Sequence, residues 1–180
     1  MKEATITCFL FDWDGTLLNN TRLIMESYSL AYQRILKQRL NPELLRACLG
    51  QRTEEITQAL HIPPAYQTAF INTFRAHQHQ SGRKGTYLMP GTRFLLKVLK
   101  FRNCHIGLVS AKRRARVVED LTYYNLQDFF EVIIGAEQCT RHKPDPTPIL
   151  QACKALHITP SKDTVAYIGD TVYDLSLIHI

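Results

Sequence analysis

Short, mostly apolar runs recur along the chain, and each ends at a polar residue or a glycine. They lie at residues 6–11, 105–109, 131–134 and 164–168. Runs of this length are typical of strands buried on both faces of a parallel sheet. Helical spacing of apolar residues accompanies the last three runs, within residues 91–102, 111–124 and 146–157. In the last of these helices we expect Asp145 as the N-cap and Pro146 at the first helical position. The alternation predicts an α/β fold with a doubly wound parallel sheet.

A long segment separates the first run from the second. Between Asp14 and His105 lie 90 residues, whereas a crossover between parallel strands needs only about a dozen. Helical patterns fill the segment at residues 21–39, 42–50, 53–60 and 64–80, followed by a linker-like stretch at 81–85. We therefore expect an α-helical cap at residues 18–84, standing over the end of the first strand. The α/β core would consist of residues 1–17 and 85–180.

The composition is that of an ordinary globular protein. Apolar residues make up 45% of the chain and charged residues 21%, and no apolar run approaches the ~20 residues of a membrane span. The five cysteines are odd in number and form no Cys-x-x-Cys pair, which argues against a disulfide framework and a zinc site. The N-terminus has no signal-peptide pattern, so we expect a cytoplasmic protein without a membrane partner.

The formal net charge of +6 suits an anionic ligand. One basic cluster, residues 112–116, lies at the start of a predicted helix. Neither an aromatic stacking pattern nor a recognised nucleic-acid-binding motif accompanies it. We therefore expect a solvated helix face near an anion site, and no nucleic-acid partner.

The residues that can carry chemistry follow the predicted strands. They are Asp12-Trp13-Asp14-Gly15-Thr16 after the first strand, Ser110 after the second, Lys143 in a proline-bounded loop after the third, and Gly169-Asp170 with Asp174 after the last. In open α/β sheets, ligands bind at the carboxyl ends of the strands. We therefore expect one crevice that gathers four aspartates, a serine and a lysine.

These residue types suit phosphoryl transfer. A carboxylate can attack phosphorus and form an aspartyl-phosphate, and Asp14 is placed to protonate the leaving oxygen. Mg²⁺ prefers oxygen ligands and retains water and phosphate oxygens. Asp12, Asp170 and the backbone carbonyl of Asp14 would supply such ligands.

Four residues are candidates for binding the phosphate of a substrate. Ser110 can donate to a phosphoryl oxygen, and Lys143 can neutralise the remaining charge. Gly15 allows a tight turn, in which exposed N–H groups of Gly15 and Thr16 would form an anion-binding nest. We expect Trp13, between the two aspartates, to pack in the core.

The four motifs in this order resemble those of the haloacid dehalogenase-like (HAD) superfamily of phosphohydrolases. They are Asp12-Trp13-Asp14-Gly15-Thr16, Ser110, Lys143-Pro144-Asp145-Pro146 and the segment from Gly169 to Asp174. The helical insert and Met89-Pro90-Gly91-Thr92 are similar to the branch of phosphoglycolate phosphatase, pyrophosphatase and β-phosphoglucomutase. The resemblance covers the chain to about residue 174 and implies a Rossmann-like core with a helical cap.

The resemblance also implies roles for individual residues. Asp12 would be the nucleophile, Asp14 the general acid/base and Asp170 a Mg²⁺ ligand, while Asp174 would ligate or orient the metal. Ser110 and Lys143 would bind phosphate. Dehalogenases of the superfamily lack an acid at the position of Asp14, so an aspartate there is similar to phosphatases and phosphomutases. The function implied is Mg²⁺-dependent hydrolysis of a small phosphorylated metabolite, with phosphoglycolate favoured.

Other functions remain open at this point. A phosphomutase or an inorganic pyrophosphatase would share the fold and the chemistry. A non-hydrolytic phosphoacceptor switch also combines acidic residues, a serine or threonine and a lysine on a doubly wound sheet, but it has neither a cap nor an acid placed like Asp14. A further alternative is a binding protein without catalytic activity. The oligomeric state is left open.

The end of the chain departs from the family pattern. After Asp174 the resemblance implies a helix and a further strand, and residues 175–180 do not match that continuation. We therefore expect a core that is incomplete at its C-terminus, with unpaired backbone groups beside the strand at 164–168.

Overall fold

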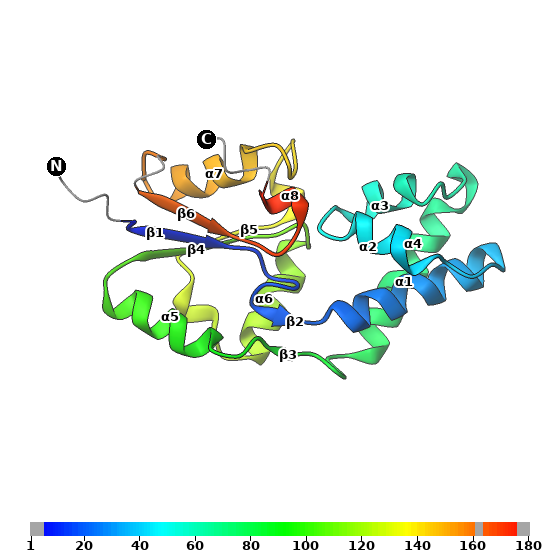
Figure 1. Cartoon of the computed structure of the whole chain (residues 1–180), viewed down its shortest axis with the longest axis horizontal. Coiled ribbons are helices and arrows are strands. Elements are labelled where there is room, and N and C mark those ends of the chain that lie inside the picture. The colour runs from blue at the N-terminus through cyan, green and yellow to red at the C-terminus, as the bar shows by residue number, and fades with distance from the viewer. Residues whose placement is uncertain (1–5, 161–163, 176–180) are drawn as a thin grey trace. The chain divides into compact units, whose positions relative to one another are not determined.

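The protein is described by a computed structural model that covers residues 6–160 and 164–175 (Figure 1). The described residues form two compact units. The core unit contains those up to Leu18 and from Leu88 onward, and the helical unit contains Asn19–Tyr87. A two-stranded ribbon of β2 (Leu18–Asn19) and β3 (Tyr87–Leu88) carries the chain from one unit to the other.

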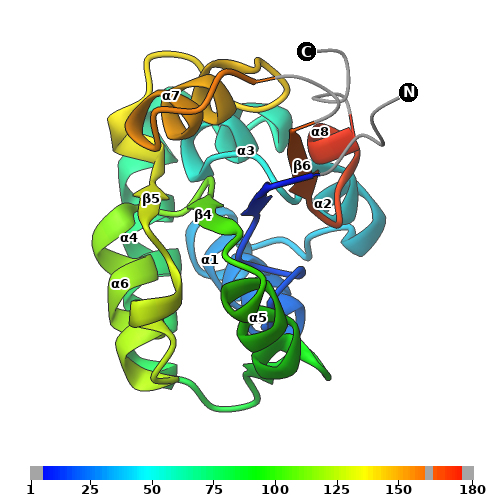
Figure 2. The same cartoon turned by 90° about the vertical axis from the view of Figure 1, so that its left-hand side faces the viewer.

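A four-stranded sheet lies at the centre of the core unit (Figure 2). Its strands are β1 (Cys8–Phe11), β4 (His105–Val109), β5 (Val132–Ile134) and β6 (Val165–Ile168). Their order is β5-β4-β1-β6, and every neighbouring pair is parallel. Cys8 is in register with both His105 and Val165, so the carboxyl ends of these strands lie at one edge of the sheet.

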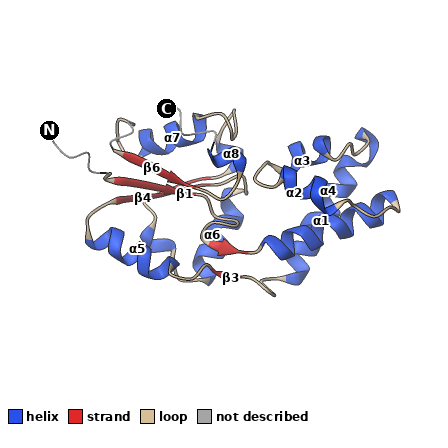
Figure 3. Ribbon diagram, in the orientation of Figure 1, coloured by secondary structure: helices blue, strands red, loops and turns tan. Residues whose placement is uncertain are grey.

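Helices cover both faces of this sheet (Figure 3). They are α5 (Thr92–Phe101) and α6 (Arg114–Tyr123) on one face and α7 (Thr147–Ala155) on the other. Strand β1 shows why, because successive side chains point to opposite faces. Phe11 packs in one core cluster with Leu96 of α5 and Leu121 of α6. Leu10 packs in another with Ile149 of α7. The predicted doubly wound α/β fold is thereby confirmed.

The helical unit has a core of its own. Its helices are α1 (Thr21–Leu36), α2 (Pro42–Cys48), α3 (Thr53–Ala59) and α4 (Pro64–Ser81). Tyr28 of α1 stacks on Phe74 of α4 with ring centroids 4.0 Å apart, and Phe70 of α4 is fully buried beside it. Asn41 caps α2, because its side chain accepts the N–H of Glu43 at 2.9 Å.

Three helix boundaries differ from the sequence expectation for local reasons. Helix α1 ends at Leu36 because Lys37 adopts a left-handed backbone conformation. Helix α7 begins at Thr147 rather than at Pro146, although the Asp145 carboxylate still accepts the Thr147 N–H at 2.8 Å. Helix α6 begins only at Arg114, so residues 111–113 form a loop that carries Lys112.

The remaining described elements are short. They are the 3₁₀ helices η1 (Gln127–Phe129) and η2 (Ala136–Gln138) and the helix α8 (Val172–Leu175). None of the described helices has the length and apolar character needed to cross a membrane. The expectation about residues 175–180 falls outside the described residues, apart from the backbone of Leu175 at the end of α8.

Candidate active site

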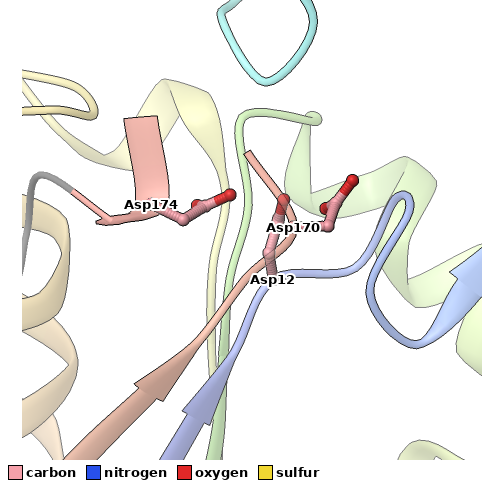
Figure 4. Close-up of side chains that lie close together, drawn as sticks. All are labelled: Asp12, Asp170 and Asp174. Atoms are coloured by element: carbon pink, nitrogen blue, oxygen red, sulfur yellow. The ribbon is translucent and has the colours of Figure 1, made fainter. Parts of the chain in front are cut away.

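Three aspartates meet at the carboxyl edge of the sheet (Figure 4). Asp12 follows β1, Asp170 follows β6, and Asp174 lies in α8. One carboxylate oxygen of each lies within 4.8 Å of those of the other two. The parallel register of β1 and β6 creates this cluster, since Phe11 and Ile168 are paired and the residues that follow them are therefore neighbours.

The two carboxylate oxygens of Asp12 have different surroundings. The side chain is buried, and its Oδ2 lies 3.2 Å from the ammonium of Lys143. Its Oδ1 is also buried but has no hydrogen-bond partner among the described residues. Burial raises the pKa of Asp12 to about 6, against the opposing effect of Lys143 and with a further contribution from the charge of Asp174. An unpartnered buried oxygen at a strand end is available to a ligand or a reacting atom.

The ammonium of Lys143 forms ion pairs with two of these aspartates, Asp12 and Asp174. Its ammonium lies 2.7 Å from Asp174 Oδ1 and 3.1 Å from the hydroxyl of Tyr167, in addition to its contact with Asp12. Burial by itself would lower the pKa of Lys143, but the charges of the two aspartates raise it overall. The lysine is therefore a fixed positive charge between two of the three carboxylates.

Asp174 is held by its own turn as well as by Lys143. Its Oδ2 accepts the backbone N–H of Thr171 at 3.0 Å and the Thr171 hydroxyl at 2.6 Å. Burial would raise the pKa of Asp174, but Lys143 and these hydrogen bonds lower it overall. The carboxylate packs so closely on Gly169 that a Cβ there would lie 2.3 Å from its Cγ. Position 169 therefore has room only for glycine while Asp174 stays in place.

Asp170 is the exposed member of the cluster, and it is held by the loop after β1. Its Oδ1 accepts the Thr16 hydroxyl at 2.9 Å. Its Oδ2 packs so closely on Gly15 that a Cβ added at position 15 would lie only 2.2 Å from it. Burial of the carboxyl raises the pKa of Asp170, with the hydrogen bond from Thr16 opposing and the charge of Asp174 adding to the rise.

The cluster fits a small divalent cation. It offers carboxylate oxygens from three residues, which is the ligand chemistry of Mg²⁺. Its negative charges outnumber the single ammonium of Lys143, and Asp12 Oδ1 lacks a partner among the described residues. A divalent cation would neutralise this excess charge and would satisfy the unpartnered oxygen.

The fourth aspartate of the predicted set, Asp14, faces a different partner. Its Oδ1 lies 2.8 Å from the ammonium of Lys112, and the same ammonium lies 2.9 Å from Oδ2 of Asp120 in α6. Asp120 also accepts the indole N–H of Trp13 at 3.1 Å. Trp13 is fully buried, as the sequence predicts.

The comparisons with known proteins bear on this geometry. Residues 9–177 match the model of one protein family, the haloacid dehalogenase-like hydrolases. The chain belongs to this family. The chain is 28% identical over 175 residues to the pyrophosphatase PpaX of Bacillus pumilus, and the match covers 97% of this chain and 79% of the relative.

Solved structures agree with the family assignment. A Bacteroides fragilis protein assigned to the haloacid dehalogenase-like hydrolases is 30% identical, with a TM-score of 0.87 over 97% of this chain and 83% of that one. A predicted phosphoglycolate phosphatase from Haemophilus somnus is 20% identical, with a TM-score of 0.86 over 97% and 81% of the two chains. At the latter identity the likeness shows the fold alone.

The structure corrects two sequence expectations, each at one residue. The N–H of Gly15 donates to the carbonyl of Leu18 at 2.8 Å, so it is already used within the turn and is not free for the expected anion nest. Lys112 is not part of a solvated helix face, because α6 starts after it and its ammonium is ion-paired to two aspartates.

Ser110 and Thr16 lie at the strand ends, as expected, and both already make local contacts. The buried Ser110 Oγ accepts the backbone N–H of Lys112 at 3.2 Å, which leaves its own hydroxyl proton for another acceptor. Thr16 directs its hydroxyl to Asp170. Of these two, Ser110 therefore retains the donor needed to bind a phosphoryl oxygen.

Sequence reasoning missed Tyr167 of the hydrolase. This residue lies within β6, and its hydroxyl contacts Lys143, Asp174 Oδ1 at 3.0 Å and the carbonyl of Val109 at 3.2 Å. Burial, followed by the charges of nearby aspartates, raises the pKa of Tyr167 well above its ordinary value, so the hydroxyl stays protonated. The available signal was a tyrosine in an otherwise apolar run directly before a Gly-Asp pair.

Proposed function

We propose that this hydrolase is a Mg²⁺-dependent phosphatase that acts through an aspartyl-phosphate on Asp12. The observation that carries the proposal is the state of the Asp12 carboxylate. One oxygen is fixed by Lys143 and the other is buried without a partner among the described residues, next to two further carboxylates. A buried carboxylate held in this way is oriented and poorly solvated, which suits nucleophilic attack.

The metal would be held by Asp12, Asp170 and Asp174, with the backbone carbonyl of Asp14 as a further ligand. When bound, Mg²⁺ would neutralise charge on the carboxylates and on the phosphoryl oxygens. Lys143 keeps Asp12 and Asp174 at a fixed separation, and Thr16 orients Asp170. One oxygen of each carboxylate lies within 4.8 Å of those of the other two, which supports a shared divalent cation.

The reaction needs two proton transfers, and Asp14 can perform both. Asp12 attacks phosphorus, the ester P–O bond breaks, and the leaving oxygen takes its electron pair and a proton from Asp14. Water then attacks the phosphorus of the aspartyl-phosphate, the bond between phosphorus and the Asp12 oxygen breaks to restore the Asp12 carboxylate, and Asp14 accepts the proton that the water loses. Ser110 would donate its hydroxyl to a phosphoryl oxygen throughout, and Lys143 would offset part of the added negative charge.

Two substrates are the first to be tested. Phosphoglycolate is favoured by the resemblance of the motifs and the helical insert, and inorganic pyrophosphate is favoured by the relatives that are named pyrophosphatase PpaX. A phosphomutase would use the same intermediate but pass the phosphoryl group to a second substrate rather than to water. The shared chemistry is phosphoryl transfer from a small phosphorylated metabolite to Asp12.

The experiment measures phosphate release from 2-phosphoglycolate and from pyrophosphate, with Mg²⁺ and with a chelator. We expect multiple turnovers that need Mg²⁺, and a phosphorylated Asp12 in acid-quenched samples analysed by mass spectrometry. A phosphorylated Asp12 that persists for minutes without turnover would instead indicate a phosphoacceptor switch. Absence of both phosphate release and modification across a panel of phosphate esters would indicate a binding protein.

A further inference from the structure

Lys112 lies beside the candidate active site in the loop between β4 and α6. Its neighbours Arg113 and Arg114 are exposed, whereas the Lys112 side chain retains 16% of its accessible surface. Its ammonium lies between Asp14 Oδ1 at 2.8 Å and Asp120 Oδ2 at 2.9 Å. A largely buried lysine between two carboxylates has a defined position, unlike a surface lysine, whose ion pairs contribute little.

Asp120 fixes the other end of this ion pair. It is buried in α6, and the oxygen that contacts Lys112 also accepts the indole N–H of the fully buried Trp13. Trp13 precedes Asp14 in the chain. Asp14 is therefore connected to α6 twice, once through the backbone of Trp13 and once through the ammonium of Lys112.

We propose that Lys112 is a positioning residue for Asp14. It holds the carboxylate that exchanges a proton with the leaving oxygen, and it does not itself touch the reacting atoms. The inference rests on the proposed function, in which Asp14 is the acid and base. Lys112 also donates its backbone N–H to Ser110 Oγ, so its loop sets the position of a phosphate-binding hydroxyl as well.

If Lys112 positions Asp14, the loss of rate on removing Lys112 should depend on the leaving group of the substrate. Phenyl phosphate and 4-nitrophenyl phosphate have nearly the same shape, but phenolate is a poorer leaving group than nitrophenolate and needs the proton from Asp14 more. General acid catalysis accelerates a reaction by roughly 10²–10⁴-fold, and a displaced acid loses part of this acceleration. Loss of Lys112 should therefore slow the first ester more than the second.

The experiment compares kcat/KM for both esters in the wild type, Lys112→Met and Lys112→Arg. kcat/KM covers the steps up to loss of the leaving group, so later hydrolysis of the aspartyl-phosphate does not mask the effect. We expect Lys112→Met to lose about tenfold or more on phenyl phosphate and less than about threefold on 4-nitrophenyl phosphate. Lys112→Arg, which keeps the cation, should restore most of the loss. The ratio of the two values is independent of how much variant is folded.

Two further variants separate positioning from a general structural role. Arg113→Met removes a neighbouring exposed cation and should leave both values unchanged within about twofold. In Asp14→Asn, which has no acid left to position, adding Lys112→Met should cause no further loss on phenyl phosphate, because residues that act through one another are non-additive.

The outcomes distinguish the two proposals. A wild type that hydrolyses neither these esters nor the metabolites named above overturns the proposed function, and the inference with it. If the wild type hydrolyses both esters and Lys112→Met loses the same factor on each, the proposed function stands and the role of Lys112 is overturned. An additive loss in the double variant would also overturn it.

Discussion

Asp12 lies in an environment that resists its ionised form. The carboxyl is 3% exposed, Asp174 is close, and the single nearby ammonium is shared between the two. Such an arrangement is common at active sites and unusual elsewhere, because it lowers the stability of the empty protein. Replacing the Asp12 carboxyl should therefore lower the activity but raise the stability of the metal-free protein.

The variant Asp12→Asn should abolish turnover while the protein stays folded. An amide has no charged oxygen with which to attack phosphorus, and it is a weaker ligand for Mg²⁺. Phosphate release with any substrate of the wild type measures the effect, and circular dichroism checks the fold. Retention of more than about a tenth of the wild-type rate, a difference below ~1.4 kcal/mol, would contradict the assignment of the nucleophile.

The contribution of Asp12 to the stability of the metal-free protein should fall as the pH rises through the acidic range. The pKa of Asp12 is raised from an ordinary 3.8 to about 6, so between these values the folded state binds more protons than the unfolded state. Linkage then requires this group's contribution to be most favourable below the ordinary pKa of 3.8 and to be lost as the pH rises through about 6. The loss is about 3 kcal/mol at most.

Chelator-treated wild type and Asp12→Asn provide the comparison, because the amide does not titrate. Urea unfolding at a series of pH values should show the wild type losing stability relative to the variant between pH 4 and 6. Parallel curves would show that Asp12 ionises normally. Mg²⁺ added at pH 7 should raise the stability of the wild type more than that of the variant.

The sequence identified the residues at the strand ends more readily than their partners. A run that ends in Asp12 or Asp170 shows which edge of a parallel sheet the carboxylate will occupy, and the fold class is confirmed. A basic run such as 112–116 does not show which side chain turns inward. That depends on where α6 begins and on Asp120, six residues after its first residue, Arg114. Tyr167 was hidden for a related reason, since an aromatic residue in a buried strand is usually a packing residue.

At the scale of elements, the turn after β1 and the turn after β6 fit against each other. Gly15 adopts a φ of +84°, and its missing side chain leaves the space that the Asp170 carboxylate occupies. Thr16 in the same turn donates to that carboxylate. The first turn therefore shapes one ligand of the candidate metal site, although it lies far from Asp170 in sequence.

Gly15→Ala should weaken Mg²⁺ binding as well as the fold. The new Cβ would meet Asp170 Oδ2 at 2.2 Å, so the carboxylate must move away from its place beside Thr16. Gly91 is a matched control, because its φ is also +84° but nothing lies within 4 Å of a Cβ there. Both alanines should cost about 1–2 kcal/mol of backbone strain. Titration calorimetry with Mg²⁺ should show a clear loss of affinity for Gly15→Ala only, and equal affinities would contradict the packing argument.

At the scale of the whole molecule, the described residues contain separate hydrophobic cores. Phe70 and Tyr28 belong to the core of the helical unit, whereas Leu121 belongs to a core beneath the sheet. The candidate metal ligands are all residues of the core unit. Stability and metal binding should therefore respond differently to damage in each unit.

Phe70→Ala should lower the unfolding temperature of the helical unit, while the core unit still binds Mg²⁺. Truncation of a fully buried phenylalanine costs roughly 3–5 kcal/mol, and here it also removes ring contacts with Tyr28 and Tyr32. In calorimetric scans we expect one transition at a lower temperature that does not respond to Mg²⁺. A second transition, at a higher temperature, should shift upward when Mg²⁺ is added. Leu121→Ala should instead lower the Mg²⁺-sensitive transition. A single transition that responds equally to Mg²⁺ in both variants would show that the units unfold together.

The central place of β1 in the sheet has a consequence for how the protein is made. This strand leaves the ribosome first among the four, but its neighbours β4 and β6 are encoded far downstream. The helices α1 to α4 can pack during synthesis, since their contacts lie within one continuous segment. Strand β1 cannot pair until β4 and β6 have been made, so its apolar side chains stay unpacked until then. Asp174 emerges later still. Until β4 and β6 have been made, β1 therefore exposes apolar side chains that chaperones can cover, and the candidate metal site cannot form before Asp170 and Asp174 have been added.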